Sequence, residues 1–290
     1  MFRPDLLRGM NLIVSGGGTG LGRSMAKRYA ELGARVVIAS RNAERLETAA
    51  AQLRAETGAH VLPIPTDIRD PDACAHLVER TVAELGAVHG LMNNAAGNFL
   101  VAAEELSTGG FDAIVDIVLK GTWYLTQAVG RRMIRQGQGG SIVSILTTYV
   151  HSGSAFVLPS AMAKAGVLAM TKSLAVEWGS AYGIRLNAIA PGPFPTEGAW
   201  QALVFDAEAA AAEMKARIPL GRFGEHEELA NLAAYLMAKE SAYVNGQCID
   251  IDGGEQLQGA GEFSNLIRHD RKQLKEVFQA MRKPKAQSEG

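Results

Sequence analysis

A glycine-rich segment near the start of the chain has the residue types of a phosphate-binding turn. SGGGTGLGRSMAKRYAELGA (15–34) follows a short apolar run and opens an amphipathic stretch, so a predicted strand passes into a helix there. Its glycines would let the backbone approach a pyrophosphate at the positive helix terminus; a merely flexible turn is the alternative. The residues expected to contact a dinucleotide here are Gly16, Gly18, Thr19, Gly20, Leu21 and Gly22.

The end of the next predicted strand indicates which dinucleotide binds. About twenty residues beyond the glycines, a carboxylate would hold a ribose 2′-hydroxyl. The sequence there reads IASRNAE, with Ser40 and Arg41 and no acid before Glu44. A carboxylate repels a 2′-phosphate, whereas a guanidinium and a hydroxyl bind it. These residues favour NADP(H); the alternative is a solvated arginine that starts a helix.

Two later segments end predicted strands in the same way. In TDIRD (66–70), Asp67 and the backbone of Ile68 could hydrogen-bond an adenine edge, or Asp67 could cap a helix. NNAAG (93–97) has small residues that would let the chain pass close to a ribose and a nicotinamide. The contacts expected in this second segment are Asn94, Ala95 and Gly97.

A phenol, a hydroxyl and an amine occur together in TTYVHSGSAFVLPSAMAKAG (147–166). Ser160 and Lys164 are four residues apart on a predicted helix that begins near Pro159, and Tyr149 lies eleven residues before the serine. A phenol and an ammonium can stabilise or protonate a developing oxyanion. The alternatives are a helix N-cap or N1 serine, a buried aromatic anchor and a surface lysine.

The elements that must position these groups alternate between short apolar runs and longer amphipathic stretches. This alternation is typical of a parallel sheet with helices on both faces. Strands are predicted at 11–16, 35–40, 61–67, 90–95, 141–146, 184–190 and 247–252. Helices are predicted at 44–56, 111–134 and 160–178. The chain has no repeat or linker, so we expect one α/β domain over residues 1–290.

Two regions fall outside this alternation. Residues 192–216 are rich in Pro and Gly and then in Ala, which suggests a substrate lid made of a loop and a helix. The tail over 255–290 is expected to be polar and to pack on a neighbour or wrap the domain.

Composition limits the classes of partner. The chain has 290 residues and a formal net charge of −1, so bulk electrostatics give no case for nucleic acid or an anionic membrane. No apolar stretch approaches the roughly 20 residues that span a bilayer, and no signal core is present. The two cysteines, Cys74 and Cys248, are expected to be reduced thiols. A cytoplasmic location is the expectation.

Taken together, these segments resemble the short-chain dehydrogenase/reductase family. The resemblance rests on the glycine turn, Asp67, NNAAG, Ser144 after the fifth strand, Lys164 and PGPFPT at 191–196. It implies a Rossmann-type, doubly wound parallel sheet of seven strands in the order 3-2-1-4-5-6-7, assembled as a homotetramer. It also adds Pro191, Gly192 and Thr196 to the expected cofactor contacts.

Within that family, the chain is similar to the 2,4-dienoyl-CoA reductases of fatty-acid oxidation. The similarity lies in GGGTGLG, DIRDPD, NNAAGNF, TTY, SLAVEWG, RIPLGR and DGGE. In those enzymes a serine, matching Ser160, replaces the usual catalytic tyrosine four residues before the lysine. The working tyrosine matches Tyr149, and an asparagine matching Asn98 assists it. A bare turn residue is the alternative for Asn98.

The resemblance implies a reaction on an acyl-CoA. Hydride adds at C5 of a conjugated 2,4-dienoyl thioester, and charge develops on the remote thioester oxygen, which Tyr149 and Asn98 would hold. Protonation at Cα then gives a 3-enoyl-CoA. Lys164 would hold the nicotinamide ribose.

The resemblance also implies substrate contacts, and two positions depart from the pattern. Phe99 would line the acyl slot or pack in the core. Arg69 and Ser107 match CoA-contacting positions, although a solvated arginine is the alternative for Arg69. Ala202 stands where a basic CoA contact is expected. Lys120 replaces an asparagine of a polar relay; we favour an outward ion pair with Asp116 over a second ammonium near Lys164.

Two other functions remain open. A carbonyl reductase of the same fold would need an acid at position 160, which Ser160 does not supply. A non-catalytic NADP(H)-binding protein is disfavoured because Tyr149, Asn98 and Lys164 occur together. His60 and His151 have no metal-type residues near them in sequence, so no metal site is expected.

Overall fold

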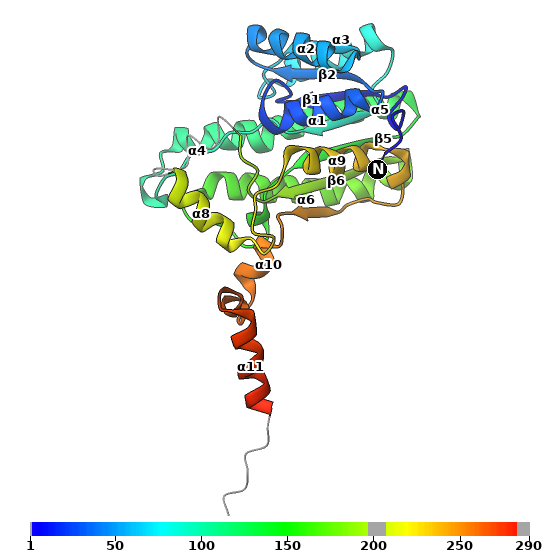
Figure 1. Cartoon of the computed structure of the whole chain (residues 1–290). Helices are drawn as coiled ribbons and strands as arrows, with labels where there is room; N and C mark the ends of the chain where they lie inside the picture. The colour runs from blue at the N-terminus through cyan, green and yellow to red at the C-terminus, as the bar shows by residue number, and fades with distance from the viewer. Residues whose placement is uncertain (1, 197–206, 283–290) are drawn as a thin grey trace, which may run out of the picture.

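One sheet of seven parallel strands organises the protein (Figure 1). The structure is a computed structural model that describes residues 2–196 and 207–282. The strand order is β3-β2-β1-β4-β5-β6-β7, so the predicted fold class and strand order are confirmed. The strands are β1 (Asn11–Ser15), β2 (Arg35–Ser40), β3 (Val61–Pro65), β4 (Gly90–Asn93), β5 (Gly140–Ile145), β6 (Ile184–Pro191) and β7 (Cys248–Ile251).

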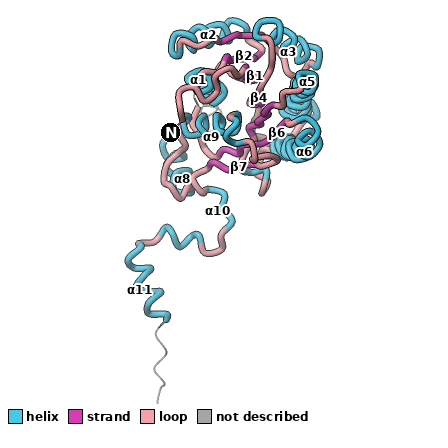
Figure 2. Tube along the Cα trace, turned by 90° about the vertical axis from the view of Figure 1, so that its right-hand side faces the viewer, coloured by secondary structure: helices cyan, strands magenta, loops and turns pink. Residues whose placement is uncertain are grey.

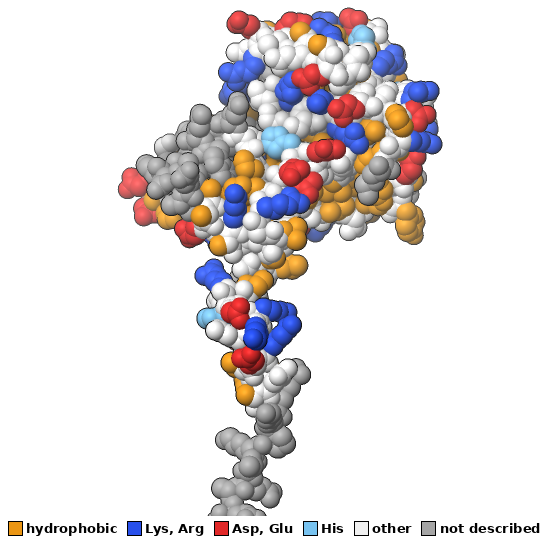
Figure 3. All heavy atoms as spheres, in the orientation of Figure 1, with side chains coloured by type: hydrophobic (Ala, Val, Ile, Leu, Met, Phe, Trp, Pro, Cys, Tyr) orange, Lys and Arg blue, Asp and Glu red, His pale blue; other side chains and the backbone are white. Residues whose placement is uncertain are grey.

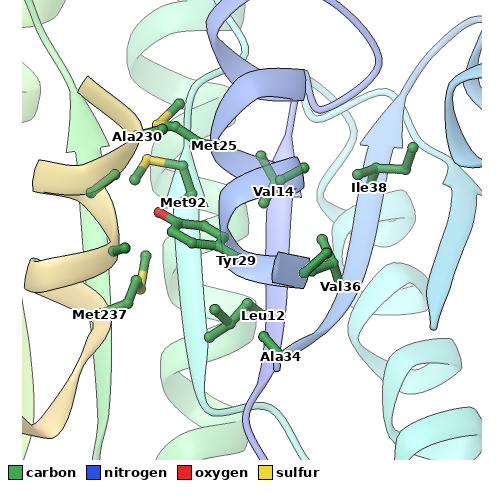
Figure 4. Close-up of a cluster of buried hydrophobic side chains, with 14 of the residues drawn as sticks. Leu12, Val14, Met25, Tyr29, Ala34, Val36, Ile38, Met92, Ala230 and Met237 are labelled. Atoms are coloured by element: carbon green, nitrogen blue, oxygen red, sulfur yellow. The ribbon is translucent and has the colours of Figure 1, made fainter. Parts of the chain in front are cut away.

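Helices cover both faces of this sheet (Figure 2). One face carries α1 (Gly20–Glu31), α2 (Ala43–Thr57) and α9 (His226–Met237). The other carries α3 (Pro71–Leu85), α5 (Gly121–Gln136) and α6 (Leu158–Tyr182). Successive side chains of a strand point to opposite faces, so Leu12 and Val14 enter the first core and Ile13 enters the second. Figure 4 shows part of the first core, where Tyr29 and Met237 lie beside the strands.

The helix predicted at 111–134 contains a π-helical turn. α4 (Thr108–Val115) runs into the turn Asp116–Lys120, and α5 follows without a break. Hydrophobic periodicity alone treats this region as one helix, because a π turn adds a residue without ending the helical hydrogen bonding. Such turns occur often at functional sites.

The predicted lid and tail are partly described. α8 (Ala207–Arg217) is the helix of the lid, while 197–206, including Ala202, lie outside the described residues. The tail forms α10 (Glu255–Ala260) and α11 (Arg271–Arg282) and extends away from the sheet in both views (Figures 1 and 2). The described part of the tail does not wrap the domain, and it exposes Leu257, Phe263 and Met281 among its polar residues.

Three expectations from the composition can be compared with the structure. None of the helices in the described ranges is long and apolar enough to cross a bilayer. On the face shown in Figure 3, acidic and basic side chains are intermingled over the sheet domain. Cys74 and Cys248 are both free thiols, as expected.

A buried serine joins the carboxyl ends of β1 and β4. The Ser15 hydroxyl oxygen accepts hydrogen bonds from the backbone N–H groups of Asn94 (3.0 Å) and Ala95 (3.1 Å). It also donates to the Met92 carbonyl oxygen at 3.4 Å. One side chain therefore holds the glycine turn against the NNAAG segment.

We expect Ser15→Ala to lower the free energy of unfolding by about 1–3 kcal/mol, because it leaves partly buried backbone donors without a partner. Denaturant unfolding monitored by circular dichroism measures the change. Ser173→Ala, on the exposed surface of α6, is the matched control and should change stability by no more than about 0.5 kcal/mol. Equal effects of the two substitutions would contradict the bridging role.

Candidate active site

Tyr149 and Ser160 come together beyond the carboxyl end of β5. Tyr149 lies in a 3-10 turn (Thr148–Val150), and its hydroxyl oxygen is 3.0 Å from that of Ser160. Ser160 is the third residue of α6, whose N-cap is Val157, so the N-cap and N1 alternatives for the serine are wrong. The fold thus closes the gap of eleven residues and places a phenol against the serine.

Lys164 lies one turn further along α6 and is buried, with only 8% of the residue exposed. Its ammonium donates a hydrogen bond to the Ile145 carbonyl oxygen at the end of β5. Burial lowers the pKa of Lys164 to about 8, because desolvation disfavours the charged form. The surface-lysine alternative is therefore wrong.

Lys120 forms the ion pair with Asp116 that the sequence favoured. Its ammonium is 2.8 Å from the Asp116 carboxylate, and its side chain is 54% exposed. The hydrogen bond to Asp116 raises the pKa of Lys120. Burial, and not a neighbouring ammonium, is the cause of the lowered pKa of Lys164.

The segment that carries Asn98 is tied to the loop after Tyr149. The Val101 N–H donates to the Phe156 carbonyl oxygen at 3.0 Å. Phe156 has φ of 64°, and an aromatic residue in this left-handed region indicates a constrained loop of the kind found at functional sites. Asn98 itself is exposed, and its side-chain oxygen accepts from the Phe99 N–H at 3.0 Å. Among the described residues, no hydrogen bond joins Asn98 to Tyr149.

The glycine turn has the close backbone approach that a pyrophosphate needs. Gly16 and Gly20 have φ of 66° and 50°. A Cβ atom on Gly22 would lie 2.2 Å from the Gly16 carbonyl oxygen, so any side chain there would disrupt the turn. The Asn94 amide donates to the carbonyl oxygens of Ser15 (3.2 Å) and Gly16 (3.3 Å). The turn opens directly into α1, whose N-terminus favours an anion.

A cavity of about 470 Å³ beside this turn has a basic lining. Arg41 and Arg45 lie on it together with Ser40, and none of its lining residues is acidic. Asn42 caps α2 by accepting from the Arg45 N–H at 2.8 Å. Sequence reasoning missed Arg45, although its place in the first turn of the helix that follows Arg41 could have indicated it. The remaining lining residues are Gly16, Gly18 and Thr19.

Asp67 and Arg69 bind each other. The Arg69 guanidinium donates to both carboxylate oxygens of Asp67, with Nε 3.0 Å from each. This contact holds the pKa of Asp67 below its usual value. The N-cap of α3 is Asp70, so the cap alternative for Asp67 is wrong. Ile68 is buried. Arg69 is exposed, which agrees with the alternative of a solvated arginine.

A second cavity, of about 660 Å³, opens beside Tyr149. Its walls come from the Tyr149 turn, the end of β6, α8 and α10. Phe194, Met214 and Arg217 line it and were not predicted, although the lid range 192–216 contains the first two. Pro191 and Gly192, both predicted, also line it.

The loop after β6 is anchored at the glycine turn. A Cβ atom on Gly20 would lie 3.3 Å from the methyl carbon of Thr196, so these predicted cofactor contacts are neighbours. His226 Nε2 donates to the Pro195 carbonyl oxygen at 2.7 Å, and its Nδ1 lies 2.9 Å from the Ser24 hydroxyl. The segment predicted to be a lid therefore starts from a fixed point beside the glycine turn.

The two predicted substrate contacts near α4 have structural neighbours. Ser107 is the N-cap of α4, and its hydroxyl oxygen accepts from the Gly110 N–H at 3.1 Å. Phe99 lies close to Gly110 and is 37% exposed, so the core-packing alternative for Phe99 is wrong.

His151 has metal-type neighbours that its sequence position did not reveal. Cys248 and Asp250 on β7 lie beside it, with the three possible ligand atoms within 4.8 Å of one another. The expectation that His151 stands alone is wrong, because the fold brings together residues about a hundred positions apart.

Comparison with known proteins identifies the family. The family model described as Enoyl-(Acyl carrier protein) reductase matches residues 16–256. A probable 2,4-dienoyl-CoA reductase of Bacillus subtilis, named as producing (2E)-enoyl-CoA, is 45% identical over 85% of this chain and 96% of that protein. A probable 2,4-dienoyl-CoA reductase of Caenorhabditis elegans, named as producing (3E)-enoyl-CoA, is 45% identical over 93% of this chain and 87% of that protein.

A solved structure agrees with these relatives. The crystal structure of a short chain dehydrogenase from Bacillus anthracis superposes with a TM-score of 0.77 and 42% identity, covering 86% of this chain and 97% of that one. Similarity of this extent shows that the chain belongs to the short-chain dehydrogenase/reductase family, whose members are oxidoreductases with a nicotinamide cofactor.

Proposed function

We propose that this protein uses NADPH to reduce 2,4-dienoyl-CoA to 3-enoyl-CoA. The observation that carries the proposal is the hydrogen bond between Tyr149 and Ser160, one helical turn before buried Lys164. Ser160 has an aliphatic hydroxyl at the position where a carbonyl reductase needs an acid. The phenol of Tyr149 lies elsewhere in the loop and is hydrogen-bonded to that hydroxyl. The relatives named 2,4-dienoyl-CoA reductases support the same reaction.

The cofactor site fits a dinucleotide that carries a 2′-phosphate. The glycine turn and the start of α1 would hold the pyrophosphate, and Ser40, Arg41 and Arg45 would hold the 2′-phosphate. Lys164 would bind the ribose hydroxyls of the nicotinamide half. Bound NADPH supplies the hydride.

The catalytic side chains would act at the thioester end of the conjugated system, remote from the carbon that receives the hydride. Negative charge that develops on the thioester oxygen needs donors already aimed at it. The Tyr149 hydroxyl can turn from Ser160 to that oxygen, and the exposed Asn98 amide supplies a second donor from the adjoining segment. Phe194 and Met214 give the cavity the apolar surface that an acyl chain requires.

CoA recognition has a candidate in the lid. Arg217 lies at the end of α8 and lines the larger cavity, and Glu255 stands nearby. A guanidinium there can bind a CoA phosphate, a role that Arg69 is less free to take while it is paired with Asp67.

The position of the product double bond, the assembly and the compartment belong to the proposal. Protonation at Cα gives the 3-enoyl thioester, whereas two relatives of equal identity are named for different products. A homotetramer and a cytoplasmic location remain predictions, and some relatives are named peroxisomal.

The first prediction concerns cofactor choice. NADPH should bind more tightly than NADH, and Arg41→Ala should remove most of that preference. A charge-assisted contact contributes about 1.5–3 kcal/mol, or roughly ten- to a hundredfold in affinity. Titration of both cofactors by fluorescence measures this. Arg80→Ala, an exposed arginine on α3, is the control. Equal affinities in the unmodified protein would refute the assignment.

The second prediction concerns the displaced phenol. Tyr149→Phe should lower turnover of a 2,4-dienoyl-CoA about a hundred- to a thousandfold while NADPH affinity is kept, because only the hydroxyl is removed. Asn98→Ala should cost a comparable factor, and the double variant less than the product of both if they hold one oxygen. The rate of NADPH oxidation, together with analysis of the product, measures these effects.

Ser160→Ala should reduce turnover far less, since it leaves the phenol in place, and Tyr182→Phe at the exposed end of α6 is the ring control. The proposal fails if Ser160 is essential and Tyr149 dispensable, or if a 3-ketoacyl-CoA is the better substrate.

The third prediction follows from the pKa of Lys164. Its folded-state value of about 8 lies below its ordinary value of 10.5. Between these values the unfolded chain binds more protons, so stability should rise with pH. From pH 7 to 10, the free energy of unfolding of the unmodified protein should rise, relative to that of Lys164→Met, by an amount approaching roughly 3 kcal/mol. Urea unfolding at several pH values measures it. Relative to Lys120→Met, which removes an exposed lysine and keeps Lys164, the unmodified protein should show no such gain. A stability difference between the unmodified protein and Lys164→Met that does not change with pH would contradict the burial argument.

A further inference from the structure

A histidine from the active-site loop faces two potential ligands on the edge of the sheet. His151 follows Tyr149 by two residues, and its Nε2 lies 3.0 Å from the Asp250 carboxylate. Cys248 and Asp250 are two residues apart on β7, so their side chains leave the strand on the same side. The imidazole nitrogen, the thiol sulfur and the carboxylate oxygen all lie within 4.8 Å of one another.

This spacing is close to that of a tetrahedral zinc site. Zinc binds sulfur at about 2.3 Å and imidazole nitrogen or carboxylate oxygen at about 2.0–2.2 Å, which places neighbouring ligand atoms roughly 3.3–3.7 Å apart. His151 and Asp250 are exposed and can adjust by rotation, whereas Cys248 is half-buried. A thiolate and a carboxylate together would balance the charge of a divalent ion.

The donor set also selects the class of metal. Magnesium and calcium prefer oxygen ligands, whereas a thiolate with an imidazole favours zinc and related ions. Three protein ligands leave a fourth position for water or another ligand. We propose that His151, Cys248 and Asp250 form a binding site for a divalent ion of the zinc class.

Such a site would act on the loop that carries the catalytic phenol. The backbone N–H of His151 donates to the Thr148 carbonyl oxygen at 3.2 Å, and the backbone N–H of Gly153 donates to the Tyr149 carbonyl oxygen at 2.8 Å. The turn is therefore compact, and Val150 within it packs in the same apolar cluster as Cys248. A metal held by His151 would tether this turn to β7 and restrict the motion of Tyr149. The inference rests on this geometry and does not require the proposed reaction.

Cobalt(II) is a suitable probe, because a thiolate ligand gives it a characteristic near-ultraviolet charge-transfer band. The full chain without an affinity tag should bind one Co²⁺ with this band, and Zn²⁺ should displace it. Cys248→Ser should abolish the band. His151→Gln and Asp250→Asn should each weaken Zn²⁺ binding at least about tenfold, in the range found when a supporting or direct metal contact is lost.

Cys74→Ala is the matched control, because Cys74 is the other cysteine and lies buried in the core away from this cluster. It should keep the band, with folding of every variant verified by circular dichroism. A second readout is turnover, which saturating Zn²⁺ should lower in the unmodified enzyme and not in Cys248→Ser. Absence of the band in the unmodified chain, or its survival in Cys248→Ser, would overturn the proposal.

Discussion

The hydroxyl of Ser160 cannot act as an acid near neutral pH, so the chemistry of this site depends on the group that the serine contacts. In the structure that group is the phenol of Tyr149, which reaches it from the end of β5. The contact needs a particular path for the loop between the two residues, and Phe156 adopts left-handed backbone geometry within that path. The bond from Val101 to Phe156 then holds the Asn98 segment against the same loop. The side-chain contact, the left-handed residue and the bond between two distant segments thus all occur in one loop.

Parallel strands supply the rest of the site, because their carboxyl ends meet at one edge of the sheet. Gly16 follows β1, Ser40 ends β2 and Asn94 follows β4. Ser15 and Asn94 hold the first and last of these ends together, because the Asn94 N–H donates to the Ser15 hydroxyl and the Asn94 amide donates to the Ser15 carbonyl oxygen. The order of the strands brings these ends together, and the Ser15 and Asn94 side chains hold them. This explains why a short glycine pattern, in its context of a strand followed by a helix, predicted the observed turn between β1 and α1.

Much of the fold follows from local patterns, whereas parts of the site do not. Short apolar runs such as 35–40 mark strands because helices bury both faces of the sheet, and Asn42 and Gly58 bound α2 as a cap and a left-handed residue. The π turn at Asp116–Lys120 could not be predicted, since periodicity does not register one inserted residue. Arg217 and the neighbours of His151 were missed because they reach their sites through long-range contacts. The pairing of Arg69 with Asp67 was also missed, because the resemblance suggested a CoA contact for Arg69 and gave no sign of this ion pair.

The turn around Tyr149 connects two chemically different surroundings. On one side its phenol borders the large cavity and the buried helix start that holds Lys164. On the other side, two residues later, His151 reaches the edge strand β7. A turn of this length cannot move at one end without moving at the other, since Gly153 is hydrogen-bonded back to Tyr149. The metal that we propose at His151 would therefore restrict the motion of the phenol. The same loop therefore links the proposed catalytic phenol to the metal site that we propose at the sheet edge.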